Sequence, residues 1–210
     1  MAWTTPGTAT AGEVLTAAFW NANVRDNSLM GQPVYTNEAA RDAAITAPSE
    51  GMSVYLTAPT IPATSGASTS ILPSGAMTIY NGSVWVCRTA VSAQQTANSS
   101  SITSATYTNA LWSAAPLTVT TVTGTTALIH LNARIAAAGN YYFVGVKSAT
   151  VAAQDAQALT MAIATQTSSG TSTFVMYGLT AGTNTFTVQM RSNTGAFTID
   201  QVNLTVQGIA

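Results

Sequence analysis

The chain has 210 residues, of which 47% are hydrophobic and only 6% are charged, and its formal net charge is -1. About 25% of the residues of an ordinary soluble domain are charged, so we expect other subunits to cover much of this surface. The near-zero net charge leaves no basic face for nucleic-acid phosphates, and the single cysteine, Cys87, excludes an intrachain disulfide.

Residues 1–33 are predicted to form an extended arm followed by a docking helix. Residues 10–13, Thr-Ala-Gly-Glu, have the form of a capping box, in which the Thr and Glu side chains each bond a free amide at the start of a helix. Apolar residues then recur roughly at helical spacing, at Leu15, Ala18, Phe19, Ala22 and Leu29. One short helix cannot bury Trp3, Phe19 and Trp20 against itself, so these side chains are expected to dock elsewhere.

The start of the chain lacks the basic residues and apolar run of a secretory signal. No stretch of the sequence reaches the ~18 consecutive apolar residues that a membrane-spanning helix needs. We therefore expect a protein that is made and folded in a cytoplasm and has no membrane partner.

Residues 34–88 are predicted to form a small module of α/β or β character. Residues 37–44 suit a short helix and residues 52–56 a strand, whereas the Thr-, Ser-, Gly- and Pro-rich stretch 59–73 is expected to be an exposed, mobile loop. A hairpin is predicted over residues 77–86, because its central Asn-Gly dipeptide supplies the two positive-φ residues of a type I′ turn.

Residues 89–114 are predicted to be a polar linker, because their Gln, Thr, Asn and Ser side chains have little to bury. Residues 115–210 alternate apolar and polar side chains in short segments, which is typical of an antiparallel β-sandwich. Eight such segments suit a jelly roll. The expected fold class is therefore mainly β, with a trimeric C-terminal sandwich. The eight expected strands cover residues 117–122, 129–135, 141–148, 159–163, 173–177, 186–191, 196–199 and 202–206.

His130 is the one histidine, and it lies with Asn132 and Arg134 on the polar side of a predicted strand. A catalytic triad or a histidine-rich metal site needs other residues to converge on the ring, and no acidic residue occurs between Glu50 and Asp155. The three residues are therefore expected to contact water or another subunit. In a threefold assembly, copies of His130 or Arg134 would meet near the axis.

No pattern in the sequence points to an enzyme, so we predict no catalytic, cofactor-binding or metal-binding residues. Asp155 and Asp200 are the only acids after residue 89, and no glycosidase signature surrounds them. Residues 178–182, Gly-Leu-Thr-Ala-Gly, lack the Lys-Ser/Thr of a phosphate-binding loop. Exposed aromatic side chains could bind a glycan, although such residues at strand spacing are more often in a core; the candidates are Tyr107, Trp112, Tyr141, Tyr142 and Tyr177.

The first 88 residues contain motifs that resemble those of tailed-bacteriophage virion proteins of the minor tail, fibre or capsid-associated type. These motifs are Trp3-Thr4-Thr5-Pro6, residues 12–21 (Gly-Glu-Val-Leu-Thr-Ala-Ala-Phe-Trp-Asn), Val24-Arg25-Asp26-Asn27, Arg41-Asp42, residues 48–52 (Pro-Ser-Glu-Gly-Met) and residues 80–85 (Tyr-Asn-Gly-Ser-Val-Trp). The C-terminal part is similar only by type to the trimeric jelly rolls that phages display as knobs, which is an analogy of architecture.

This resemblance implies a structural protein of the virion, displayed on the particle surface as a trimeric capsid decoration or head-fibre-like protein. Its partners would be its own copies and a major capsid or tail protein. The alternative is a receptor-binding tail fibre or spike tip that binds host surface glycan, although we find no coiled-coil or repeated shaft. The expected attachment residues are Trp3, Leu15, Phe19, Trp20, Arg25 and Asp26.

The dipeptide Arg-Asp occurs at residues 25–26 and again at residues 41–42. Each copy suits either a weak surface ion pair or a fixed contact between the docking helix and its binding surface. Both interpretations stay open at the level of sequence.

Overall fold

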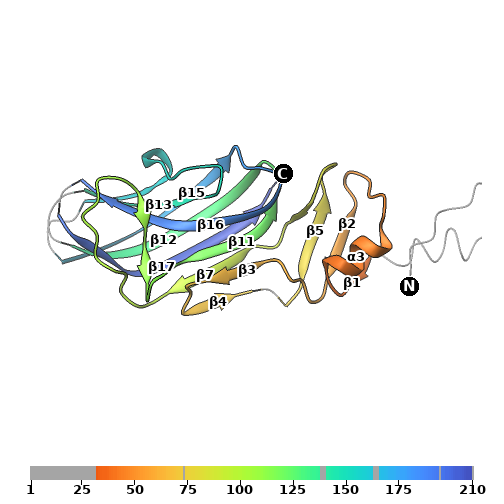
Figure 1. The fold of residues 1–210 in the computed structure, drawn as a ribbon, viewed down its shortest axis with the longest axis horizontal. Coiled ribbons are helices and arrows are strands. Elements are labelled where there is room, and N and C mark those ends of the chain that lie inside the picture. The colour runs from red at the N-terminus through yellow and green to blue at the C-terminus, as the bar shows by residue number, and fades with distance from the viewer. Residues whose placement is uncertain (1–31, 73, 138–140, 163–165, 194, 210) are drawn as a thin grey trace, which may run out of the picture.

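The computed structural model describes residues 32–72, 74–137, 141–162, 166–193 and 195–209 (Figure 1). These residues form a small module and, next to it along the long axis of the molecule, a larger β-sandwich. The predicted arm and docking helix, with all six expected attachment residues, lie in residues 1–31 and therefore outside the described part of the chain.

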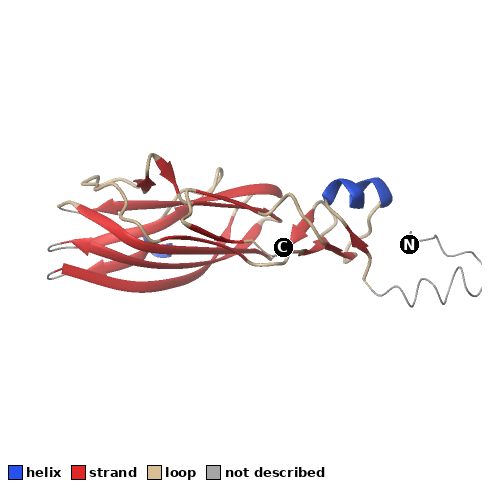
Figure 2. Ribbon diagram, turned by 90° about the horizontal axis from the view of Figure 1, so that it is seen from below, coloured by secondary structure: helices blue, strands red, loops and turns tan. Residues whose placement is uncertain are grey.

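The small module is a four-stranded sheet with a helix on one face (Figure 2). The sheet has the order β1-β2-β5-β6, in which the strands are β1 (Val34–Tyr35), β2 (Ser53–Leu56), β5 (Ala76–Tyr80) and β6 (Trp85–Cys87). Helix α3 (Glu38–Ala44) begins after its N-cap Asn37, whose side chain accepts a hydrogen bond from the amide of Ala40 at 3.0 Å. This confirms the helix that was predicted over residues 37–44.

The predicted hairpin is present, but its turn is not of type I′. Tyr80 pairs with Trp85, so residues 81–84 form a four-residue connection. Within it only Gly82 has a positive φ, of 90°. The Asn81 side chain instead accepts hydrogen bonds from the amides of Ser83 at 3.1 Å and Val84 at 2.9 Å. An Asn side chain that bonds the backbone two residues on stabilises such a turn without a second positive φ.

The sandwich consists of a six-stranded and a five-stranded antiparallel sheet, which we name after one long strand of each, β16 and β12. The β16 sheet has the order β14 (Leu159–Ala162), β13 (Tyr141–Lys147), β16 (Gly182–Ser192), β11 (Thr118–Thr123) and β3 (Ala63–Ser65), and β8 (Thr108–Asn109) also pairs with β16. The β12 sheet has the order β15 (Gln166–Tyr177), β12 (Thr126–Ala137), β17 (Phe197–Gly208), β7 (Val91–Gln95) and β4 (Thr69–Ile71). Strands β9 (Leu111–Trp112) and β10 (Ala115–Pro116) form a separate small ribbon, and a 3-10 turn, η2, spans Asp155–Gln157.

The strand order is that of a jelly roll. Without the short edge strands β3 and β4, the sheets read β7-β17-β12-β15 and β11-β16-β13-β14. Apart from the step from β13 to β14, each strand lies in the opposite sheet from the strand before it in this set. Eight strands that cross between two sheets in this way define the double Greek key of a jelly roll. The expected fold class, mainly β with an antiparallel sandwich, is confirmed.

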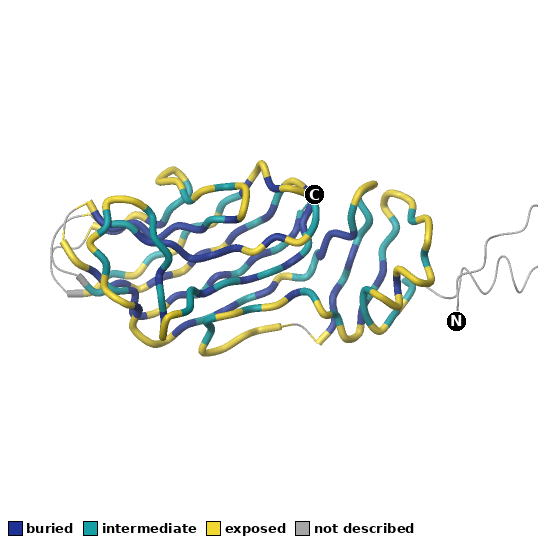
Figure 3. Tube along the Cα trace, viewed as in Figure 1, coloured by how far each residue is buried: buried dark blue, intermediate teal, exposed yellow. Residues whose placement is uncertain are grey.

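The sandwich core follows from alternation along the strands (Figure 3). Successive side chains of a strand point to opposite faces, so Ile129, Leu131, Ala133 and Ile135 of β12 are fully buried. Phe186, Val188 and Met190 of β16 pack into the same core from the facing sheet. The polar residues between them on β12, among them His130, point to the outside of the sandwich.

Two segments that were expected to be linker and loop are parts of the sheets. In residues 89–114, β7 pairs with β17 and buries Val91 and Ala93. Together with the seven strands β11 to β17, it completes the eight strands of the jelly roll. In residues 59–73, β3 pairs with β11 and β4 pairs with β7, one at the edge of each sheet. Edge strands bury little side-chain surface, so polar and small residues suit them.

The two strands that were predicted at residues 196–199 and 202–206 are one strand, β17. Arg134 pairs with Gln201 and Ile135 with Ile199, which leaves Asp200 without a Cα partner on β12. This extra residue is a β-bulge. It interrupts the alternation, which made one strand look like two in the sequence.

Candidate functional sites

A cavity of about 220 Å³, partly open to solvent, lies at the joint between the module and the jelly roll. We call it the joint cavity. Most of its lining comes from the module, and Val122 of β11 supplies the jelly-roll wall. Its lining residues are Glu38, Arg41, Ile61, Thr78, Val84, Trp85, Cys87 and Val122.

The joint itself is closely packed beside this cavity. A Cβ atom on Gly208, at the end of β17, would lie 2.7 Å from Cγ1 of Val86 and 2.8 Å from the carbonyl oxygen of Cys87. The side-chain amide of Gln207 donates a hydrogen bond to the carbonyl of Arg88 at 2.6 Å. The Arg88 guanidinium in turn donates to the carbonyl of Ile209. These contacts fix β17 to the module, so the cavity walls hold a defined spacing.

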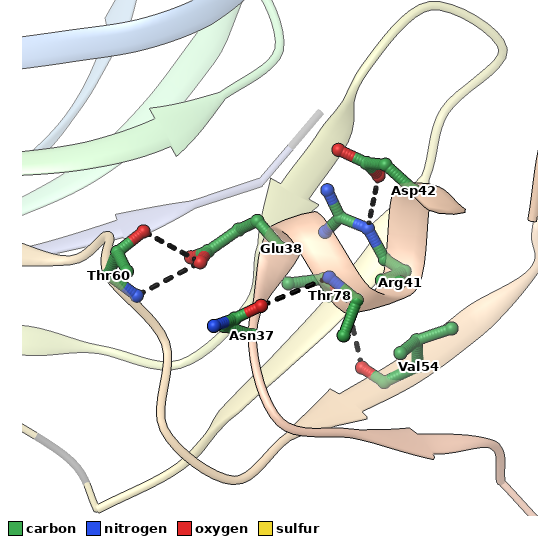
Figure 4. Close-up of polar contacts among 8 residues, drawn as sticks. Asn37, Glu38, Arg41, Asp42, Val54, Thr60 and Thr78 are labelled. Carbon is green, nitrogen blue, oxygen red and sulfur yellow. Dashed lines mark hydrogen bonds and ion pairs between the residues drawn. The ribbon is translucent and has the colours of Figure 1, made fainter. Parts of the chain in front are cut away.

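Glu38, in the first turn of α3, binds the segment of the chain that leads from the module to β3 (Figure 4). Its carboxylate accepts hydrogen bonds from the amide of Thr60 at 2.9 Å, from the Thr60 hydroxyl at 2.8 Å and from the amide of Ile61 at 3.0 Å. Partial burial acts to raise the pKa of Glu38, but the hydrogen bonds from Thr60 and Ile61 outweigh it and hold the pKa below its ordinary value. The carboxylate therefore stays ionised while the hydrogen bonds from Thr60 and Ile61 are formed.

Arg41 is buried, with 5% of its surface exposed, although it is an arginine on a short surface helix. Its Nε donates to Oδ1 of Asp42 at 2.8 Å, and its guanidinium carbon lies 4.7 Å from the centroid of the Trp85 ring. The guanidinium thus gains an ion pair and a cation–π contact. Within the module Arg41 thus has fixed partners, whereas Asp42 remains exposed. A contact with the docking helix stays a prediction, because that helix lies outside the described residues. The copy at residues 25–26 lies outside the described residues.

Two further polar groups of the cavity lining also have bonding partners. The Thr78 hydroxyl donates to the carbonyl of Val54 at 3.2 Å (Figure 4). The Cys87 thiol lies 3.6 Å from the carbonyl of Thr89, and burial raises the pKa of this thiol. A thiol with a raised pKa is a poor nucleophile at neutral pH. The remaining lining is apolar, so the cavity suits an apolar group.

His130, Asn132 and Arg134 lie together on the exposed face of the β12 sheet, as the alternation predicts. Nδ1 of His130 is 2.7 Å from the Thr173 hydroxyl, and the Asn132 amide donates to the Thr171 hydroxyl at 2.9 Å. These bonds join β12 to β15 across the outer face. Their expected role at a subunit interface remains a prediction.

Arg134 pairs with the bulge residue Asp200, with 3.5 Å between Nε and Oδ2. Oδ1 of Asp200 is buried and has no hydrogen-bond partner among the described residues. Asp155 lies on the other side of the sandwich, where it pairs with Arg191 of the β16 sheet. Asp155 and Asp200 therefore bind different arginines and do not form a pair of carboxylates.

A second polar cluster, centred on Arg191 of β16, was not predicted from the sequence. Nε of Arg191 donates to Oδ1 of Asp155 at 2.8 Å, its Nη2 also contacts that carboxylate, and its Nη1 donates to Oδ1 of Asn193 at 2.6 Å. The guanidinium carbon lies 3.8 Å from the centroid of the Phe143 ring. The Tyr107 hydroxyl donates to Asp155 at 3.0 Å. The cluster therefore holds η2 and the segment around residue 107 against the outer face of the β16 sheet.

The charges of this cluster shift the acidity of its members. The hydrogen bond from Arg191 lowers the pKa of Asp155. Burial, followed by the hydrogen bond to Asp155, raises the pKa of Tyr107. The ion pair is thus formed at neutral pH. Asp155 and Arg191 are 36 residues apart in sequence, and only the strand register brings them together.

The five aromatic glycan candidates do not form one platform. Trp112 and Tyr142 are buried in the core, and the Trp112 indole N–H donates to the carbonyl of Ala97 at 2.8 Å. Tyr107 is half-buried in the Arg191 cluster. Only Tyr141, on the β16 sheet, and Tyr177, on the β12 sheet, are open, with 56% and 65% of their surface exposed.

Within the described residues, no group of three or more His, Cys, Asp or Glu side chains could hold a metal ion. None of the helices in this part of the chain is long and apolar enough to cross a membrane.

No protein-family model matches this sequence, and no curated protein matches it. Among solved structures, an isomalto-dextranase of Arthrobacter globiformis T6 complexed with panose is similar to 74% of this chain, at 14% identity and a TM-score of 0.31. The match covers 33% of that protein's chain, so this chain spans about a third of its length. A likeness this distant carries no argument about function.

Proposed function

We propose that this chain is a structural protein of a bacteriophage virion, displayed on the particle surface as a homotrimer and anchored by its N-terminal segment. The single observation that supports subunit contact is the neutrality of the jelly roll. Residues 89–210 contain only five charged side chains, and four of these form the ion pairs Arg134–Asp200 and Arg191–Asp155. Such a surface has little charge repulsion between copies.

The outer face of the β12 sheet is the surface that we assign to subunit contact. It presents His130, Asn132 and Arg134 among Thr and Ser hydroxyls that already bond one another across strands, such as Ser92 and Thr205 at 2.6 Å. Three copies of such a neutral polar face can meet around a threefold axis without burying an isolated charge.

Light scattering on the full chain tests this assembly. We expect a mass three times that of one chain at micromolar concentration. A glutamate at Asn132 would place three like charges in the interface and should shift the mass toward that of one chain, whereas Thr183→Glu, on the exposed end of the β16 sheet, should not. A single-chain mass for the unmodified protein contradicts the proposal.

Location on the particle separates the two virion roles. For capsid decoration, we expect electron-microscopy density at many equivalent capsid positions. Deleting residues 1–30 should leave a folded trimer that no longer binds particles. A truncated chain that still decorates particles would place the attachment elsewhere.

The alternative is a receptor-binding tail fibre or spike tip, and the open ring of Tyr141 favours it. Tyr141 lies beside Asn193, whose amide donates to the Tyr141 carbonyl at 3.3 Å. An exposed ring beside a polar cluster suits the face of a sugar. A few copies per particle, together with glycan binding that Tyr141→Ala abolishes, would favour this role over decoration.

A further inference from the structure

The joint cavity has the size and chemistry of a binding site for one aromatic ring. Its volume of about 220 Å³ exceeds the ~150 Å³ of an engineered apolar cavity that takes up benzene. The ring of Trp85 and the side chains of Ile61, Val84 and Val122 form its apolar walls. The carboxylate of Glu38 and the other polar groups described above are engaged within the chain, so an aromatic ring would gain dispersion contacts without displacing their bonds.

We propose that this cavity holds the side chain of Phe19 or Trp20 from the N-terminal segment of the same chain. Gln32, the first described residue, contacts the side chain of Met77 of β5. Thr78, the next residue of that strand, lines the cavity from the opposite face of the sheet. Gln32 therefore lies against the sheet that forms part of the cavity wall, and a segment that reaches the cavity passes around the edge of this sheet.

Chain length allows this placement. Trp20 and Gln32 are twelve positions apart, a distance that spans up to ~40 Å when the chain is extended or about 18 Å as a helix. The module sheet has four strands, and neighbouring strands are only ~4.8 Å apart. Trp3 is a weaker candidate, because the loop that it would close is longer and costs more entropy.

The inference does not depend on the virion role proposed above. In the helix that the sequence predicts for this segment, adjacent residues would point about 100° apart, so one of the two rings could enter the cavity while the other faces outward to a partner. A docked ring would fix the direction in which the N-terminal segment leaves the module. Binding to particles and filling of the cavity can therefore fail separately.

Methyl NMR of the full-length chain tests the inference in the absence of any particle. The resonances of the Val84 and Val122 methyl groups are compared between the unmodified chain and the double variant Phe19→Ala/Trp20→Ala. We expect loss of a ring-current shift at both residues in the variant. Added indole should then bind the variant at least tenfold more tightly than the unmodified chain. Trp3→Ala removes one indole from the same segment and is the matched control, so it should behave as the unmodified chain does.

Three results would overturn the inference. The first is unchanged Val84 and Val122 resonances in the double variant. The second is equal binding of indole to the unmodified chain and the double variant, which would show a site that the segment does not occupy. The third is a response to Trp3→Ala equal to that of the double variant.

Alkylation of the only cysteine provides a second measurement, because Cys87 lines the same cavity. We expect a small alkylating reagent to modify Cys87 at least tenfold faster in the double variant than in the unmodified chain. In a Val84→Phe background, in which the new ring occupies the cavity, the double substitution should no longer change this rate. The matched control is Val34→Phe, at an exposed side chain of the same module. Equal rates in the unmodified chain and the double variant would contradict an occupied cavity.

Discussion

Replacing Glu38 with Gln should weaken the attachment between α3 and the chain that leads into the jelly roll. The carboxylate accepts three hydrogen bonds, two from Thr60 and one from Ile61. A Gln side chain has one acceptor oxygen, so it can keep the two bonds from Thr60 and must turn its NH2 group toward the amide of Ile61. Hydrogen bonds to a charged group contribute about 1.5–3 kcal/mol each when buried. Because this site is partly exposed, we expect the free energy of unfolding to fall by about 1–2 kcal/mol.

Urea denaturation with two fluorescent reporters measures this change and its location. Trp85 reports on the module and Trp112 on the jelly roll, and both are buried. Replacing Trp3 and Trp20 with Phe removes the other two tryptophans. We expect the Trp85 transition to move to lower urea in Glu38→Gln, and the Trp112 transition to move less or not at all.

The pH dependence gives an independent check of the same interaction. The pKa of Glu38 is lower in the folded chain than its ordinary value, which is about 4.3 in an unfolded peptide. Its contribution to stability is therefore fully present above that value and is lost as the pH falls through the lower, folded pKa. Glu38→Gln should remove this part of the acid-induced loss of stability.

The matched control is Glu50→Gln, at an exposed acid of the same module. A change in the free energy of unfolding below about 0.3 kcal/mol for Glu38→Gln, within the range of ordinary surface substitutions, would refute the reasoning. An equal change in both variants would also refute it, because it would indicate a general charge effect.

Three other substitutions test the remaining contacts. Leu131→Ala, at a fully buried site, should lower the free energy of unfolding of the jelly roll by about 2–5 kcal/mol, measured by Trp112 fluorescence in urea. Gly208→Ala should reduce the melting temperature, because its new Cβ would lie 2.7 Å from Val86 and within 3 Å of two backbone oxygens; an unchanged melting temperature would show that the joint can yield. Asp155→Asn should cost at most about 1 kcal/mol at pH 7. The cost should vanish at a pH below the lowered pKa of Asp155, and hydrogen exchange near residue 107 would detect the loosened segment.

Strands with bulky alternating residues could be predicted from the sequence, and strands made of small polar residues could not. Ile129, Leu131 and Ile135 mark β12 because they are large, lie at alternate positions together with Ala133, and have polar residues at the positions between. By contrast, β7 has the sequence Val-Ser-Ala-Gln-Gln over residues 91–95, and only its first residue is a large aliphatic one. The strand is stable because β17 and β4 pair with it on both sides, which is a property of the sheet and not of the segment.

The candidate sites divide in the same way. The exposed row that includes His130 follows from the period of one strand, so the sequence was sufficient to place it. The joint cavity draws its walls from α3, from the β5–β6 hairpin and from β11, and the Arg191 cluster joins residues as far apart as 107 and 193. Such arrangements depend on how strands pair across the sheets, and no local sequence pattern predicts them.

The course of β17 determines where a fused peptide would be presented. This strand starts at Phe197, paired with Ala137 at the end of the sandwich remote from the module. It then returns to the joint, where Ile209, the last described residue, receives the Arg88 guanidinium (Figure 1). A peptide fused after Ile209 would therefore start at the joint, beside the module. The described ends of β12 and β13, at Ala137 and Tyr141, lie at the end of the sandwich remote from the module, so an epitope placed between these two strands would be displayed away from the module.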